Sequence, residues 1–173
     1  MAYEGDARYW TIGLDYLTNA NLLMGMNVNY EQSQIGFNQA INGSVEKSGF
    51  RGDIYAGYQF GNGITVEALA SAANLDNKIS ANFDTGRTKS KRRMANLKVL
   101  GQTQILRMDI EPYLNTAFIF EDYEAYMTDG GLEVEAFSTS QNFGALGFET
   151  HPSIYEYLGL SPYFGLQAEW QSY

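Results

Sequence analysis

The apolar residues near the start of the chain fall on every second position. In residues 9–16 the residues between them are mostly small or polar, and the same alternation returns in residues 22–30. Successive side chains of a β-strand point to opposite faces, so a period of two predicts a strand in each range. Residues 19–21 contain two asparagines and predict a turn, so the two strands are expected to form an antiparallel hairpin.

The same alternation predicts six further strands. They are expected over residues 48–60, 64–72, 94–106, 110–121, 139–150 and 160–170. The predicted connections are short at 19–21, 61–63 and 107–109, and long and polar at 32–47, 76–92 and 126–137. Tight turns at one end and long loops at the other are typical of a membrane barrel. We therefore predict an all-β, antiparallel up-and-down meander of about eight strands in one domain, residues 1–173, that closes into a transmembrane β-barrel.

Composition supports strands and excludes several classes of function. The chain has 18 Gly, only 3 Pro and 14% aromatic residues, a mixture that favours strands over helices. Its formal charge of −9 argues against nucleic acid as a partner, because nucleic-acid binding needs a positive surface. With no Cys there is no disulfide framework and no thiolate metal site. No secretion signal is visible at the N-terminus, so an exported protein would be present here in its mature or recombinant form.

Alternation alone leaves open which face of the sheet points outward. A ring of about eight strands has an interior just wide enough to be filled by side chains, and the bulky apolar face would overfill it. We therefore predict that the apolar face contacts lipid, with aromatic residues near the strand ends forming interfacial girdles. The predicted lipid-facing aromatics are Trp10, Tyr16, Tyr30, Phe50, Tyr58, Phe60, Phe118, Phe120, Phe164 and Trp170.

The polar face is then predicted to line a narrow lumen. It carries glycines, which suit a crowded interior, and charges of both signs, which can pair with one another. The predicted lumen-facing charges are Asp15, Glu31, Arg51, Asp53, Glu67, Lys98, Glu111, Glu121 and Glu169. Two readings of these charges stay open: they tune conductance, or they pair and plug the interior.

A basic cluster stands out in this acidic chain. Arg87, Lys89, Lys91, Arg92 and Arg93 fall in the predicted connection 76–92 and at its end, and we interpret them as a basic loop. These charges either bind the phosphates of surface lipids or an acidic partner, or they only keep a flexible loop soluble.

Catalytic and metal-binding chemistry is not predicted. The single histidine, His151, has Ser153 and Glu156 close behind it, all in one connection where a solvated turn is expected rather than a catalytic arrangement. One histidine cannot build a histidine-rich metal site. We therefore expect no enzyme activity, no metal and no cofactor.

Several of these segments resemble the β-domains of autotransporters. The residues that carry the resemblance are Tyr9–Tyr16, Leu22–Tyr30, Tyr55–Tyr58, Gly61–Gly63 and Leu160–Leu166. The resemblance implies an outer-membrane barrel that anchors an N-terminal passenger and assists its export. It also implies the bacterial outer membrane as location and three partners: the lipid bilayer or a detergent replacing it, the barrel-assembly machinery and a passenger segment.

The chain also departs from that family's pattern. Autotransporter β-domains have twelve strands, a pore-threading helix and a last strand ending in an aromatic residue, whereas eight strands are predicted here. We therefore expect an incomplete or re-engineered portion of a larger barrel. The function predicted is a membrane anchor and possible conduit. Two alternatives are a soluble β-barrel that binds a small apolar ligand and a complete eight-strand surface barrel that acts in adhesion through its long loops.

Overall fold

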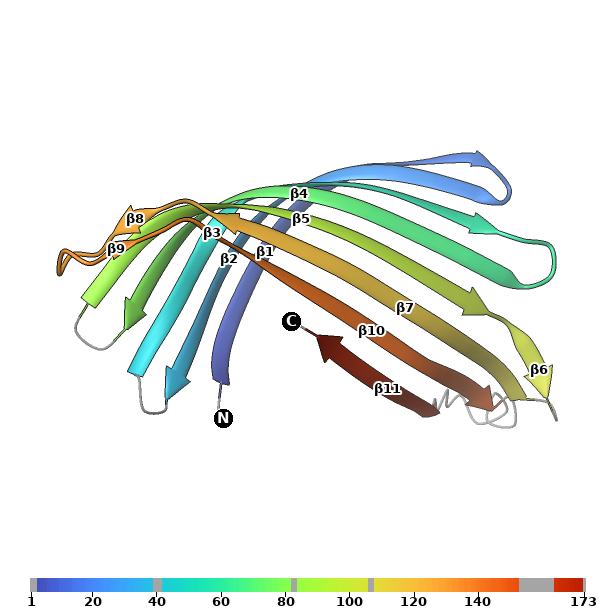
Figure 1. Ribbon diagram of the computed structural model, residues 1–173. Helices are drawn as coiled ribbons and strands as arrows, with labels where there is room; N and C mark the ends of the chain where they lie inside the picture. Colours follow the sequence, from blue (N-terminus) through green and yellow to red (C-terminus); the bar gives the residue numbers. More distant parts are fainter. Residues whose placement is uncertain (1–2, 39–41, 82–83, 106–107, 153–163, 173) are drawn as a thin grey trace.

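The computed structural model describes residues 3–38, 42–81, 84–105, 108–152 and 164–172, and all its regular structure is β-strand (Figure 1). The strands are β1 (Tyr3–Asn19), β2 (Leu22–Asn38), β3 (Asn42–Gln59), β4 (Ile64–Ala81), β5 (Asp84–Gly101), β6 (Thr103–Ile105), β7 (Met108–Tyr123), β8 (Tyr126–Met127), β9 (Glu133–Val134), β10 (Phe137–Pro152) and β11 (Phe164–Ser172). No helix long and apolar enough to cross a membrane occurs in the described part of the chain.

Eight long strands form one antiparallel sheet in sequence order. The order is β1-β2-β3-β4-β5-β7-β10-β11, while β6 pairs with β7, and β8 and β9 form a separate two-stranded sheet. The predicted all-β meander is therefore confirmed. Figure 1 shows the sheet as an arch with both chain ends beneath it. Within the described residues β1 pairs only with β2 and β11 only with β10, so the predicted closure into a ring is not found there.

The strands are longer than the sequence pattern predicts. The β2–β3 ladder continues from Tyr30↔Phe50 to Asn38↔Asn42, and the β4–β5 ladder continues to Ala81↔Asp84. The predicted long connections at 32–47 and 76–92 are therefore wrong over most of their length. The reason is that a backbone ladder does not need apolar side chains, so the strands continue where the apolar alternation ends.

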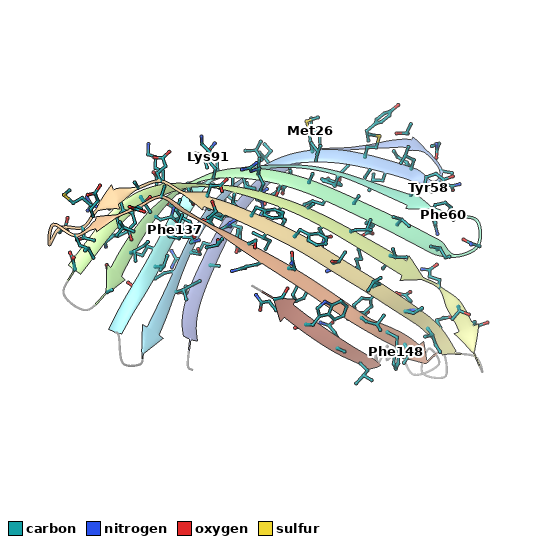
Figure 2. The ribbon with its side chains drawn as sticks, viewed as in Figure 1. Met26, Tyr58, Phe60, Lys91, Phe137 and Phe148 are labelled. Carbon is teal, nitrogen blue, oxygen red and sulfur yellow. The ribbon has the colours of Figure 1, made fainter. Side chains whose placement is uncertain are left out.

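Burial is inverted relative to a water-soluble protein. Trp10 and Ile12 are 77% and 78% exposed, whereas Glu31 and Glu121 on the opposite face are only 4% and 6% exposed. Met26 and Lys91 project from the convex side of the arch, and Phe137 lies on its concave side (Figure 2). The buried side chains are thus polar or small, apart from Leu75, and most of the large apolar residues lie on the exterior.

The chain between β7 and β10 folds back on the start of β5. Thr128 forms a bridge with Gly86, and the ring of Tyr126 covers Gly86 so closely that no side chain would fit there. The Asp84 carboxylate accepts a hydrogen bond from the Gly130 amide at 2.8 Å. Hydrogen bonds from the Thr128 hydroxyl and the Gly130 amide hold the pKa of the Asp84 carboxyl below its usual range. The β8–β9 hairpin is therefore attached to the β4–β5 hairpin by charge-assisted contacts.

Candidate functional site

A network of charged side chains crosses the concave face. Its centre is Glu121 on β7, whose carboxylate accepts hydrogen bonds from Lys47 Nζ at 3.0 Å, Arg92 Nε at 3.1 Å and Ser90 Oγ at 2.6 Å. Lys47 Nζ also donates to the Tyr123 hydroxyl at 2.7 Å. A carboxylate this deeply buried is tolerable only because cations and donors surround it.

The network continues to the other side of the arch through Arg92. Its Nη1 lies 2.9 Å from Glu31 on β2, and Arg51 lies 3.6 Å from the same carboxylate. Arg51 pairs with Asp53: its Nε lies 2.9 Å from Oδ1, and its Nη2 donates a hydrogen bond to Oδ2 at 3.3 Å. The Asp53 carboxylate accepts a hydrogen bond from Asn29 Nδ2 at 2.8 Å.

Curvature of the sheet makes these contacts possible. Two strands separate β2, which carries Glu31, from β5, which carries Arg92, and two strands separate β3, which carries Lys47, from β7, which carries Glu121. Neighbouring strands are about 4.8 Å apart, so a flat sheet would hold these partners about 14 Å apart. Bridging at about 3 Å requires side chains that converge on a narrow concave space.

Two tyrosines cross a glycine to reach a polar group on the next strand. The Tyr55 ring lies over Gly25, where a side chain would approach its Cζ to 2.3 Å, and the hydroxyl donates to the Asp15 carboxylate. In the same way Tyr113 lies over Gly147 and donates to Gln167. Each glycine therefore leaves room for an aromatic ring on the concave face, and each ring connects three neighbouring strands.

The remaining predicted lumen charges also occupy concave-face positions. Glu67 lies opposite Lys98 in the β4–β5 ladder, and Lys98 Nζ lies 6.0 Å from the ring centroid of Tyr113. Glu169 accepts a hydrogen bond from Gln167. Glu111 lies two residues before Tyr113 on β7, at a position of the same face. Within the described residues these three carboxylates do not join the network around Glu121.

Sequence reasoning missed four members of the network. Lys47, Ser90 and Arg92 fall in segments predicted to be loops, and Tyr123 follows the predicted end of its strand. Had the alternation been continued from Asn96 back along the chain, it would have placed Arg92 and Ser90 on the same face as Asn96. Extending β3 from Arg51 back to Lys47 gives the same result.

The basic cluster is not a loop, which corrects the prediction. All five residues lie on β5, where alternation separates them: Arg92 joins the concave network, while Arg87, Lys89, Lys91 and Arg93 are exposed on the convex face. We call these four the outward cation row. The strand was not recognised because both faces of β5 before Met94 carry polar residues.

The convex face carries a belt of exposed apolar residues. Nine of the ten predicted lipid-facing aromatics are large exposed side chains there, while the side chain of Phe164 lies outside the described residues. Tyr30 and Phe50 pack at a centroid distance of 5.2 Å, and Tyr58 and Phe60 pack edge to face at 4.7 Å. Trp170 lies over Gly144, which has no side chain to obstruct it. Trp10, Met24 and Phe118 lie in this exterior belt, contrary to the arrangement that a soluble barrel with an apolar interior requires.

The other predicted connection residues give no site. The side chain of His151 and the whole of Ser153 and Glu156 lie outside the described residues. The described part of the chain has no group of three or more His, Cys, Asp or Glu side chains arranged to hold a metal ion.

Residues 1–172 match the family model described as the autotransporter beta-domain. The translocator domain of the autotransporter NalP from Neisseria meningitidis has a TM-score of 0.71 at 13% identity, covering 98% of this chain and 61% of that one. The beta domain of the Bordetella autotransporter BrkA has a TM-score of 0.73 at 17% identity, covering 99% and 73%.

Other outer-membrane proteins match the fold with lower TM-scores. The ferripyoverdine receptor of the outer membrane of Pseudomonas aeruginosa has a TM-score of 0.56 at 10% identity, covering 96% of this chain and 30% of that one. No curated protein matches this chain. At these identities the structural likenesses show the fold alone, and the chain spans 61% of the length of the NalP domain.

Proposed function

Because the chain belongs to the autotransporter β-domain family, we propose that it acts as an outer-membrane anchor and translocator scaffold for a passenger segment. The observation that supports this role most directly is the inverted burial: the apolar belt faces outward and the charged network is packed inside. Such an exterior is stable only against hydrocarbon, since exposed apolar area of this extent is unfavourable in water.

The two ends of the sheet suggest its direction in the membrane. At one end, β2 to β5 extend about eight residues beyond the belt, for example from Glu31 to Asn38 on β2. At the other end the turn Asn19–Leu22 lies directly beside the belt. Outer-membrane barrels have short periplasmic turns and longer extracellular segments. In our proposal the extended end is extracellular and the Asn19–Leu22 turn is periplasmic.

The partners follow from this role. Lipid or detergent covers the belt, the barrel-assembly machinery inserts the domain, and a passenger is attached to it. The charged network occupies the concave face between β2 and β7, so transit of a peptide along that face requires Lys47, Glu121 and Arg92 to separate. Anchoring needs no such separation, and it is therefore the primary role in this proposal.

Two adjacent positions on β4 test the orientation. The chain has no Cys, so Ala70→Cys and Ser71→Cys each introduce one site, on the convex and the concave face respectively. Each variant is labelled with a thiol-reactive fluorophore and inserted into phosphatidylcholine liposomes that contain a lipid-attached quencher. We expect strong quenching at position 70 and weak quenching at position 71. Equal quenching, or a monomer that stays in solution without detergent, would contradict the proposed function.

A further inference from the structure

We propose that the convex face of β3 to β5 is a binding site for a phosphorylated glycolipid of the outer leaflet, of the bisphosphorylated lipid A type. The acyl chains lie in an apolar groove, and the phosphates and sugar hydroxyls of the one headgroup lie side by side against the outward cation row and a polar groove that adjoins it. The inference rests on the proposed function, which makes this face the lipid-facing one.

The apolar groove lies within the belt. Its volume is about 810 Å³, and its outward-facing floor is formed by the small side chains of Ala56, Ala68, Ala70 and Ala95. Met26 on one side and Phe118 on the other are bulky and form its walls. A row of alanines between bulky neighbours leaves a hollow that matches a hydrocarbon chain, whereas an even belt would offer lipid only a flat surface.

The outward cation row begins where the alanine row ends. In the β4–β5 ladder Ala70 lies opposite Ala95, Ala72 opposite Arg93, and Asn74 opposite Lys91. Alternate residues of a strand are about 6.6 Å apart, so the four cations rise about 20 Å from the edge of the belt. That edge is the level at which the phosphates of membrane lipids lie, and Arg and Lys are the usual phosphate-binding side chains.

The hollow stays open at the level of Arg93. Gly52 lies beside Ala72 in the β3–β4 ladder, and a side chain added at Gly52 would meet no atom within 4 Å. Small residues therefore continue from the alanines of the groove to the level of the first cation.

Carboxylates near the row determine which cations are available. Among the described residues Arg93 pairs with Asp122 and Lys78 pairs with Glu46, while Lys91, Lys89 and Arg87 have no carboxylate within the 4.0 Å that defines an ion pair. Asp76 lies opposite Lys89 in the ladder without reaching it. Arg87, Lys89 and Lys91 are thus the cations available to phosphate, since Asp122, which lies opposite Lys91 in the β5–β7 ladder, forms its ion pair with Arg93.

A second, polar groove adjoins the upper part of the row. It has a volume of about 700 Å³, and its outward-facing lining includes Gln32, Gln34, Asp76, Lys78 and Lys89. Amide and carboxylate side chains of this kind hydrogen-bond the hydroxyl groups of sugars. A simple phospholipid would fill the apolar groove and contact one cation but leave the polar groove empty. The combination of all three features favours a headgroup that carries both sugars and phosphates.

The test measures lipid binding by the 173-residue chain in phosphatidylcholine nanodiscs. The probes are bisphosphorylated lipid A, its monophosphorylated form and phosphatidylglycerol, each titrated and followed by native mass spectrometry. We expect the bisphosphorylated lipid to bind most tightly and Lys91→Gln and Lys89→Gln each to weaken it about five-fold, the effect of one cation near a membrane surface. Ala70→Leu, which fills the groove, is expected to weaken both forms of lipid A.

Lys98→Gln is the matched control, because it removes one positive charge from the concave face and should leave lipid binding unchanged. Insertion into nanodiscs is checked first for every variant. If the chain inserts but Lys89→Gln and Lys91→Gln bind like the wild type, or phosphatidylglycerol binds as tightly as lipid A, this inference is overturned and the proposed function stands. If the unchanged chain fails to insert, the proposed function is overturned as well.

Discussion

At the scale of single residues, the glycines of the concave face are tied to specific aromatic partners. Gly25 is the clearest case, because its missing side chain is what allows the Tyr55 ring to reach Asp15 across β2. Gly57, on the same face, has only Glu67 Cγ nearby, at 3.7 Å from an added side chain. The two glycines therefore differ in what substitution would disturb.

We expect Gly25→Ala to destabilise the domain by about 1–3 kcal/mol, because the new methyl group displaces Tyr55 and breaks its hydrogen bond. Gly57→Ala serves as its control and should change the free energy of unfolding by under about 1 kcal/mol. The change can be a gain in stability, because alanine lowers the conformational entropy of the unfolded chain. Urea unfolding in detergent, followed by the fluorescence of the two tryptophans, measures both. Equal losses of unfolding free energy in the two variants would show that the position of Tyr55 does not depend on the missing side chain of Gly25.

The charge of Glu121 holds two cations in the concave network. Glu121→Gln keeps the shape of the side chain but weakens the hydrogen bonds from Lys47 and Arg92, and we expect a loss of about 1.5–3 kcal/mol in unfolding free energy. Glu46→Gln is a suitable comparison, since the Glu46–Lys78 pair is 46% and 43% exposed. Its loss should remain under about 1 kcal/mol. A larger loss from Glu46→Gln than from Glu121→Gln would contradict the packed arrangement of the network.

At the scale of elements, one carboxylate helps to hold the β8–β9 hairpin against β5. Asp84 lies at the start of β5, well beyond the apolar belt, and its pKa is lowered by the Thr128 hydroxyl and the Gly130 amide. A carboxyl whose pKa is lower in the folded state contributes stability above its unfolded pKa, and that contribution is lost as the pH falls through the folded value.

We therefore expect the β8–β9 hairpin to loosen at acid pH, as the pH falls below about 4, the pKa of an unfolded aspartate. Hydrogen exchange of residues 126–134 measures this loosening. Asp84→Asn should show fast exchange already at neutral pH and little further change on acidification. A wild-type hairpin that stays equally protected from pH 7 to pH 3 would rule out a role for the Asp84 charge.

The existence of the eight long strands was predictable from the sequence, and their lengths and the short β8–β9 hairpin were not. The belt segments of β1, β2, β3 and β7 alternate between apolar and polar residues, so the period of two identified them directly. Beyond the belt both faces of β5 are polar, as at Thr88 and Lys89, and only the alternation of buried and exposed positions shows the period of two. Such a strand is indistinguishable from a polar loop until its ladder partners are known.

At the scale of the whole molecule, the inward and outward faces followed from residue size. Bulky side chains such as Trp10 and Phe118 could not fill the concave space that Glu31, Arg92 and Glu121 occupy in the structure. The pairing inside that space was not predictable, because partners on strands three apart meet only through curvature. The groove along Ala68 and Ala70 was equally hidden, since small residues in an apolar pattern give no separate signal.

The eight-residue extensions beyond the belt have a consequence for anything attached to this domain. At about 3.3 Å per residue they form a paired collar some 26 Å long, measured along the strands. In a translocator a segment leaving the concave side is then released well clear of the bilayer surface. The rim of the collar, rather than the membrane, becomes the first surface that an emerging polypeptide meets as it folds.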